Sequence, residues 1–198
     1  MNVNVQPIHG NWDVGYSLDK HMISSTFLGY DEWGHARFDN NRTDVGEAIY
    51  QLKYKDDFTQ CAPIAKSLYD NIIPYLAEIH LIIAMPPSKA RSQQPVPEIA
   101  RELAILTKLP FIDRFLIKSK ETPQMKDIES RADKIAALQQ SIQINVPLVN
   151  QTLPSTGYNV LIVDDLYDTG TSLEVATSIL RNCDKINKIF VATATRKN

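Results

Sequence analysis

The second half of the chain alternates between short apolar runs and segments with helical periodicity. The run from His80 to Met85 is apolar without alternation and stops at Pro86, which is typical of a strand buried on both faces. Tyr158 to Val163 has the same character, and further strands are predicted over Phe111 to Ile117 and Lys188 to Thr195. Because helices are predicted between these runs, the pattern favours an α/β fold with a parallel sheet and helices on both faces.

Helices are indicated where apolar residues recur every three or four positions. The first begins at Thr43 and carries Val45, Ile49 and Leu52 on one face. The other predicted helices begin at Asp57, near Pro97, at Ile128 and at Ser172.

The spacing of polar residues supports two of these helix starts, and one further segment has an ambiguous pattern. Asp57 with Gln60, and Thr171 with Glu174, have the spacing of a capping box. Ser141 to Leu153 stays ambiguous, because its apolar residues first alternate as they do in a strand.

Residues 1–42 are polar and irregular, yet they hold six of the chain's 16 aromatic residues. Disordered segments are poor in aromatic residues, so short strands or an ordered cap are predicted here. We therefore expect a small N-terminal cap or hood over residues 1–42, within the same domain as an α/β body over residues 43–198.

Size and charge exclude several classes of protein. The 198 residues fit one domain that can bury a core without disulfides. Lys and Arg total 21 against 23 Asp and Glu, a net charge of −2, so the charge does not indicate a nucleic-acid binder. No apolar stretch is long enough to span a bilayer, the first residues do not resemble a secretory signal, and two cysteines cannot form a disulfide framework. A cytoplasmic protein without a membrane partner is expected.

The segment from Val160 to Leu173 carries the sharpest chemical signal. A buried strand delivers two adjacent carboxylates, Asp164 and Asp165, to the carboxyl edge of the sheet, where ligands of open α/β sheets bind. A turn rich in Thr and Gly then leads into a helix, whose first backbone N–H groups can bind an anion. Carboxylates suit sugar hydroxyls or a hydrated Mg²⁺, and the turn suits a phosphate. The segment predicts a site for a ribose 5-phosphate, and an ordinary strand–turn–helix with two solvated acids is the alternative.

Leu161 to Leu173 resembles the binding signature of the type I phosphoribosyltransferases, whose shared substrate is phosphoribosyl pyrophosphate. Over about residues 48–195 the chain also resembles the ComF-like branch, named for a bacterial competence protein. The matching segments are Leu52-Lys53-Tyr54, Pro86-Pro87, Arg91-Ser92-Gln93-Gln94 and Thr122-Pro123-Gln124. The chain departs from that branch where Arg91 to Gln94 replaces Arg-Gly-Phe-Asn-Gln, and it lacks an N-terminal cysteine-rich zinc module.

The resemblance implies a type I phosphoribosyltransferase-like sheet and a role for each matching residue. Asp164 and Asp165 would hold the ribose hydroxyls, directly or through Mg²⁺. The 5-phosphate would lie in the turn formed by Asp168, Thr169, Gly170, Thr171 and Ser172. The pyrophosphate would lie against a loop formed by Pro86, Pro87, Ser88 and Lys89, and the catalytic residues would be Asp168, Lys89 and Arg91. Asp168 falls where some relatives carry an Asp proposed as general base; an Asp that bonds its own turn is the alternative.

The function implied is transfer of a phosphoribosyl group to a nitrogen acceptor such as a nucleobase. The partners would be phosphoribosyl pyrophosphate and a small-molecule acceptor, with Mg²⁺ as cofactor and a homodimer left open. The alternative is a non-catalytic binding or regulatory protein that keeps the fold to sense a phosphoribosyl ligand, or that serves DNA uptake or processing as the competence name suggests. A hood could stack Trp12, Tyr30 or Trp33 on a base, although aromatic residues in such a segment more often serve packing.

Overall fold

The computed structural model describes residues 1–88, 91–118 and 130–197. Its strands are β1 (Gln6–Pro7), β2 (Val14–Lys20), β3 (Met22–Tyr30), β4 (Ala36–Arg42), β5 (Leu81–Ala84), β6 (Leu116–Lys118), β7 (Ile142–Ile144), β8 (Tyr158–Tyr167) and β9 (Ile186–Arg196). Its helices are α1 (Asp44–Tyr54), α2 (Cys61–Asn71), α3 (Pro95–Thr107), α4 (Arg131–Ser141), α5 (Val146–Thr152) and α6 (Thr171–Arg181), with short 3₁₀ helices at Phe58–Gln60 and Ile73–Tyr75.

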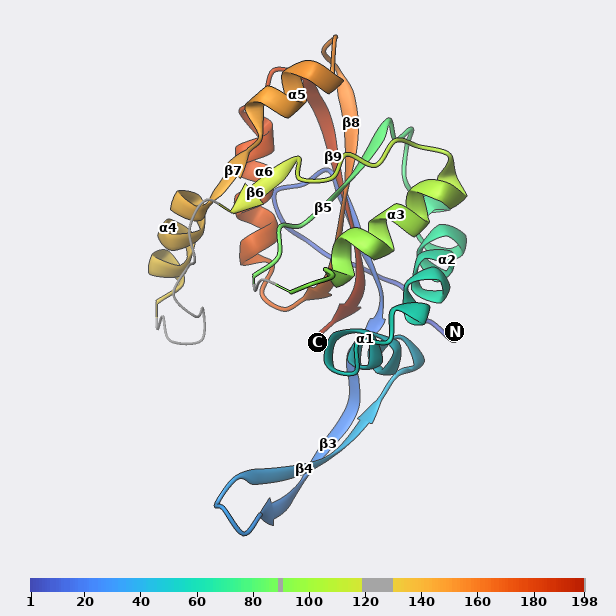
Figure 1. Ribbon diagram of the computed structural model, residues 1–198, viewed down its shortest axis with the longest axis vertical. Coiled ribbons are helices and arrows are strands. Elements are labelled where there is room, and N and C mark those ends of the chain that lie inside the picture. The colour runs from blue at the N-terminus through green and yellow to red at the C-terminus, as the bar shows by residue number, and fades with distance from the viewer. Residues whose placement is uncertain (89–90, 119–129, 198) are drawn as a thin grey trace.

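A five-stranded sheet in the order β1-β2-β9-β8-β5 forms the centre of the fold (Figure 1). β2, β9, β8 and β5 run parallel to their neighbours, and β1 pairs with β2 antiparallel at one edge. In β8, Leu161 and Val163 pack into one buried cluster while Val160 and Ile162 pack into the other. Both faces of the strand are therefore covered, which confirms the predicted α/β fold and explains why its sequence is an unbroken apolar run.

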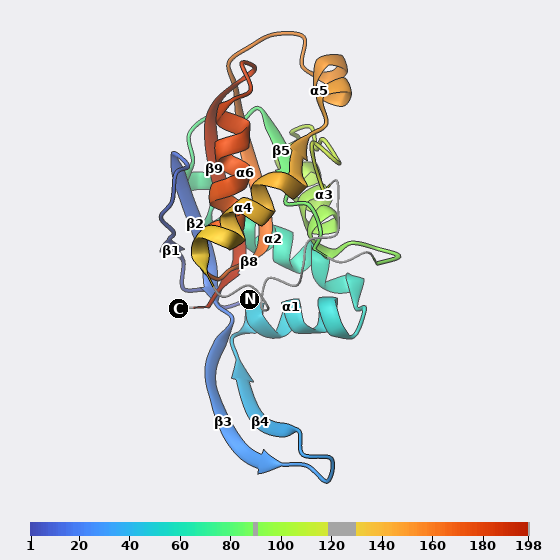
Figure 2. The same ribbon diagram turned by 90° about the vertical axis from the view of Figure 1, so that its left-hand side faces the viewer.

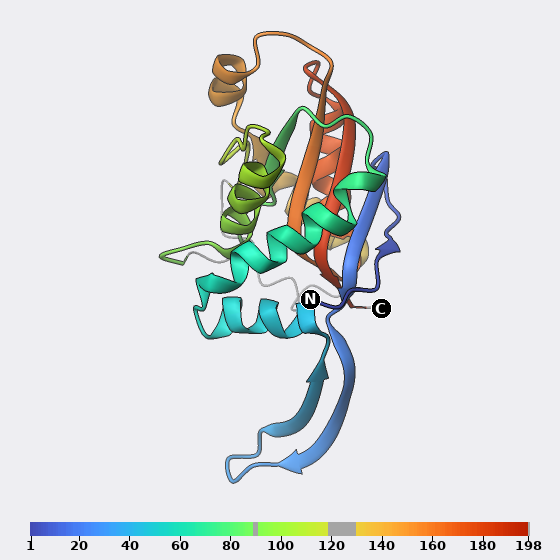
Figure 3. The same cartoon turned by 90° about the vertical axis from the view of Figure 1, so that its right-hand side faces the viewer.

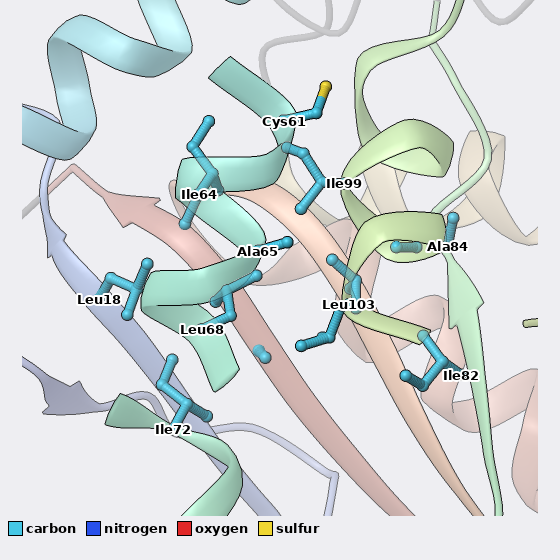
Figure 4. Packing of buried hydrophobic residues seen from close by; sticks show 14 of the residues in the cluster. Leu18, Cys61, Ile64, Ala65, Leu68, Ile72, Ile82, Ala84, Ile99 and Leu103 are labelled. Atoms are coloured by element: carbon cyan, nitrogen blue, oxygen red, sulfur yellow. The ribbon is translucent and has the colours of Figure 1, made fainter. Parts of the chain in front are cut away.

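One face of the sheet is covered by α1, α2 and α3. Their apolar side chains meet those of the strands in a single buried cluster. Figure 4 shows α2 contributing Ile64 and Leu68, α3 contributing Ile99 and Leu103, and β2 contributing Leu18. The helical periodicity read from the sequence thus corresponds to the buried face of each helix.

The opposite face is covered chiefly by α6, with α4 packed beside it (Figure 2). α6 buries Leu173, Ala176 and Leu180 against this side of the sheet. The predicted helix start at Ile128 lies outside the described residues, and α4 is described from Arg131 onward. Within the ranges that the structure describes, no helix is both long and apolar enough to cross a membrane.

The N-terminal segment divides between the sheet and a projecting hairpin. β2 lies inside the central sheet, paired with β9 from Val14 beside Phe190 to Lys20 beside Arg196. β3 and β4 form a separate antiparallel hairpin that extends away from the body (Figure 3). The prediction of short strands is confirmed, whereas a hood function for the segment stays a prediction.

The predicted single strand over Phe111 to Ile117 is wrong. Phe111 makes one parallel bridge to Ile82, and a turn that includes Arg114 then redirects the chain. Arg114 has a φ of 56°, a left-handed conformation that ends an extended segment. β6 follows this turn and pairs antiparallel with β7 in a small separate sheet. The apolar pattern indicated extended chain but carried no signal for the turn.

The ambiguous segment after α4 contains both a strand and a helix. β7 follows the alternation through Ile142 and Ile144, but Val146 opens α5 instead of continuing the strand. Pro147 lies in the first turn of α5, and the Asn145 side chain caps it by accepting a backbone N–H at 3.4 Å. A proline at a helix start is favourable because its missing N–H has no partner to lose there.

The first turn of α1 lies directly on the junction between β2 and β3. Thr43 accepts the N–H of Gly46 at 2.9 Å, and its hydroxyl donates to the backbone oxygen of Lys20 at 2.6 Å. A Cβ placed on Gly46 would overlap the backbone oxygen of His21. The contact between helix and strand therefore leaves no room for a side chain at position 46.

Gly46→Ala is expected to destabilise the protein. In an exposed helix the same change stabilises by about 0.5–1 kcal/mol, because glycine is the poorer helix former. Here the added methyl group must push α1 away from His21, and such overpacking costs about 1–3 kcal/mol. Urea denaturation followed by circular dichroism measures the free energy of unfolding, and a gain in stability would contradict the close approach.

Candidate active site

A cleft of about 350 Å³ opens at the carboxyl edge of the sheet, where β5 and β8 end. Among the described residues, its charged lining consists of Lys53, Arg91, Lys118, Asp164 and Asp165. Pro86, Pro87 and Ser88 line it from the loop after β5, and Ser172 lines it from the start of α6. The cleft thus joins segments that are far apart in the sequence, and it places acidic and basic side chains around the same space.

The two adjacent acids lie near the end of β8, as the sequence predicted. The backbone N–H of Asp165 donates to Oδ1 of Asp164 at 2.9 Å. Burial and the neighbouring charge of Asp165 raise the pKa of Asp164 to about 8. Behind them, Thr195 of β9 donates to the backbone oxygen of Asp165 at 2.9 Å, which fixes this end of the strand. The acid pair is therefore held in place by backbone contacts and is electrostatically strained.

Lys53 is a site residue whose role the sequence did not reveal. It lies in the last turn of α1, and its Nζ is 2.7 Å from Oδ2 of Asp165. The Lys53 side chain is 25% exposed and the Asp165 side chain 13% exposed, so water screens this ion pair only partly. Leu52-Lys53-Tyr54 resembles a family segment, but its local sequence does not predict a contact with a residue more than a hundred positions away.

The loop after β5 is placed at the cleft as expected. Pro86, Pro87, Ser88 and Arg91 all line it, while Lys89 lies outside the described residues. Lys118 at the end of β6 brings another cationic side chain, and burial lowers the pKa of its ammonium group. Basic groups from three different segments therefore line the same cleft as the acid pair.

The turn after β8 differs in one respect from the prediction. The capping box of Thr171 and Glu174 is wrong, because α6 begins one residue earlier than that motif requires. Gly170 is the N-cap residue, with a φ of 77° and no side-chain cap, and Thr171 is the first helical residue. The hydroxyls of Thr169 and Thr171 lie 3.0 Å apart at this helix start. An uncapped helix start beside hydroxyl groups suits an anionic group.

Asp168 lies on the exposed side of this turn. Its Oδ2 is 3.1 Å from Nζ of Lys197, and the Asp168 side chain is 49% exposed. The cleft lining includes Ser172 from the predicted phosphate turn, but it does not include Asp168 or its neighbours Thr169 to Thr171. The structure thus places the acid pair and the loop after β5 together in the cleft, with most of the turn at its margin.

The acid pair fits a partial donor set for Mg²⁺. Among the described residues, no cluster of three or more His, Cys, Asp or Glu side chains could hold a metal ion by itself. Mg²⁺ often uses only one or two protein carboxylates and completes its octahedron with water and substrate phosphates. The oxygens of Asp164 and Asp165 meet that requirement when water or ligand oxygens complete the octahedron.

A family model described as "Phosphoribosyl transferase domain" matches residues 60–198, and the chain belongs to this family. The mostly parallel sheet flanked by helices is the fold expected of its type I members, so the predicted fold class is confirmed. The ComF-like branch stays a prediction. No curated protein matches the chain.

Three solved structures illustrate the likeness. Adenine phosphoribosyltransferase from Trypanosoma brucei, in complex with AMP, pyrophosphate and ribose-5-phosphate, is 11% identical, covers 97% of this chain and 74% of its own, and gives a TM-score of 0.47. A hypothetical protein from Neisseria gonorrhoeae with bound ppGpp is 16% identical over 70% of this chain and 68% of its own, with a TM-score of 0.45. Hypoxanthine phosphoribosyltransferase from Staphylococcus aureus is 18% identical over 71% and 68%, with a TM-score of 0.42. These likenesses are too distant to add to the family assignment.

Gly170→Ala is expected to destabilise the protein more than Gly157→Ala does. Both glycines have positive φ, 77° and 88°, so alanine pays about 1–2 kcal/mol of backbone strain at either position. A Cβ at Gly157 meets nothing within 4 Å, but at Gly170 it lies 2.8 Å from Cε2 of Tyr167. Displacing that ring adds about 1–3 kcal/mol. Thermal and urea unfolding measure the stability that each variant loses. Equal losses of stability in the two variants would contradict the contact between position 170 and the Tyr167 ring.

Proposed function

We propose that this protein binds phosphoribosyl pyrophosphate together with Mg²⁺ and transfers its phosphoribosyl group to a nitrogen acceptor such as a nucleobase. Membership of the family supports phosphoribosyl transfer in general. The observation that carries the finer proposal is the cleft in which the acid pair faces Lys53, Arg91 and Lys118. A sugar diol with a phosphate on one side and a pyrophosphate on the other matches that distribution of charge.

Each part of the ligand has a counterpart in the site. Asp164 and Asp165 accept hydrogen bonds from the two ribose hydroxyls, or hold them through Mg²⁺. The 5-phosphate lies at the start of α6, where no side chain caps the first backbone N–H groups. The pyrophosphate lies against the loop after β5, where Arg91 offers a fork of donors suited to phosphate oxygens.

The proposed reaction is a displacement at the anomeric carbon. The bond from C1′ to the pyrophosphate oxygen breaks, and pyrophosphate leaves with the bonding electrons. The acceptor nitrogen forms the new bond to C1′ and loses its proton. As negative charge develops on the leaving group, Arg91 and Lys118 stabilise it within a cleft that is only partly open to water. Mg²⁺, when bound, would supply further positive charge at the pyrophosphate.

Asp168 is proposed as the base that takes the acceptor's proton. Its carboxylate is paired with Lys197 at 3.1 Å, so it must leave this exposed ion pair to reach a proton. An exposed pair of this kind contributes at most about 1 kcal/mol, so the rearrangement costs little.

Tyr54 is the aromatic residue best placed to receive a nucleobase. It lines the cleft, is 66% exposed, and its ring is stacked on that of Tyr50 with centroids 5.3 Å apart. Trp12 is buried in the core, where its Nε1 donates to the backbone oxygen of Ile8 at 3.0 Å, so it is not free to stack on a base. The exposed Trp33 lies in the turn between β3 and β4 and is not part of the cleft lining.

Incubation with Mg²⁺, phosphoribosyl pyrophosphate and a panel of nucleobases is expected to release pyrophosphate with at least one acceptor.

Asp164→Asn combined with Asp165→Asn should lower the affinity for phosphoribosyl pyrophosphate at least about a hundredfold, because two charge-assisted contacts of about 1.5–3 kcal/mol each are lost. Isothermal titration calorimetry with Mg²⁺ present measures the affinity.

Asp184→Asn, an exposed carboxylate in the turn before β9, is the matched control and should bind normally. Equal affinity in the double variant would remove the acid pair from the binding site. Binding without pyrophosphate release on any acceptor would instead favour a regulatory protein that senses the ligand.

A further inference from the structure

The ion pair between Lys53 and Asp165 occupies the acid pair that the proposed function assigns to a metal. Resting on that function, we propose that Lys53 is the counter-ion of the acid pair in the ligand-free protein and that it competes with divalent metal for Asp165. Lys53 thereby keeps the free site poor in Mg²⁺.

A cation beside Asp164 and Asp165 favours the ionised forms of both side chains. Two neighbouring carboxylates in a partly buried site repel each other, and each is more stable as an anion when a positive charge lies close by. The Lys53 ammonium supplies that charge at 2.7 Å from Oδ2 of Asp165. Among the salt bridges between described residues, this is the one that joins the acid pair to a basic group. Lys53 therefore fills the electrostatic role that a metal would otherwise fill.

The position of Lys53 is set by α1 and not by a flexible tail. Leu52, its neighbour, is fully buried, and Val45 and Ile49 on the same face of α1 are buried as well. At the other end of the helix, Gly46 is in contact with the backbone of His21. Since α1 is fixed at both ends, the base of the Lys53 side chain cannot move far from β8, and its ammonium group remains close to Asp165.

Lys53 and a metal ion on the same carboxylate would lie very close together. An Mg²⁺ ion binds a carboxylate oxygen at about 2.0–2.1 Å. With the ammonium 2.7 Å from Oδ2, both cations on that oxygen would be within about 5 Å of each other. Their repulsion is poorly screened where Asp165 is 13% exposed, so one cation weakens the binding of the other. Pyrophosphate oxygens relieve the conflict, because they give both cations additional negative partners.

Titration with Mn²⁺ in the absence of phosphoribosyl pyrophosphate, followed by electron paramagnetic resonance of the free ion, tests the competition. Lys53→Met removes the charge and is expected to tighten Mn²⁺ binding roughly tenfold, the factor that corresponds to a change of about 1.4 kcal/mol. Lys53→Arg keeps the charge and should remain near the wild-type affinity. Lys55→Met removes an exposed lysine two residues further on and should change the affinity less than about twofold, since exposed charges act weakly.

Circular dichroism of each variant establishes that it is folded before metal is added. Mn²⁺ affinity that is equal in all four proteins, or too weak to measure in Lys53→Met, would overturn the proposal, as would equal tightening by Lys55→Met. The outcome is separable from that of the proposed function. If phosphoribosyl pyrophosphate binds but Lys53→Met leaves the Mn²⁺ affinity unchanged, the competition alone fails; if the Mn²⁺ affinity rises but no phosphoribosyl ligand binds, the assigned substrate fails.

Discussion

Repulsion between two adjacent carboxylates is the constraint around which this site is arranged. Asp164 and Asp165 follow each other in sequence near the end of a strand whose preceding residues are fully buried, so they cannot separate. Three features offset the repulsion: partial access to water in the cleft, the backbone N–H of Asp165 on Asp164, and the ammonium of Lys53 on Asp165. The burial and repulsion that remain raise the pKa of Asp164 above that of an ordinary aspartate.

The parallel sheet is what brings the charges to one place. Parallel strands end at the same edge, so the loop after β5 and the turn after β8 meet there although 79 residues separate Met85 from Asp164. Two helices of one face also contribute residues to this edge, since α1 ends and α3 begins beside it. A rigid core thus positions loops whose side chains line one cleft.

Sequence reasoning recovered those parts of the fold that depend on local periodicity. β5, β8 and the apolar faces of α1, α2 and α3 were predicted because burial imposes a pattern on consecutive residues. The acid pair was found for the same reason, since it directly follows a recognisable strand. The turn at Arg114 was missed because a left-handed residue other than glycine leaves no mark on the apolar pattern. The start of α6 was misplaced because Thr171 and Glu174 have the right spacing while Gly170 takes the cap position.

The contact of Lys53 with Asp165 could not be predicted from local sequence. It depends on where α1 docks against the sheet, and that position is decided by packing between residues distant in sequence. The place of β2 inside the central sheet, beside β9, could not be predicted either, because the sequence of a strand does not specify which strands pair with it. Secondary structure, a linear motif and the loop that carries Arg91 could therefore be predicted from the sequence, whereas the contact of Lys53 with the acid pair required the assembled core.

The close contact between Gly46 and the backbone of His21 constrains the sequence of any chain that docks this helix in the same way. Any sequence that seats this helix so tightly on the preceding strand must leave position 46 without a side chain, three residues after the threonine that begins the helix. A related chain that docks this helix in the same way is therefore expected to have a threonine followed at that spacing by glycine. A lysine seven residues beyond the glycine would be expected only where the pairing with the aspartate is also present.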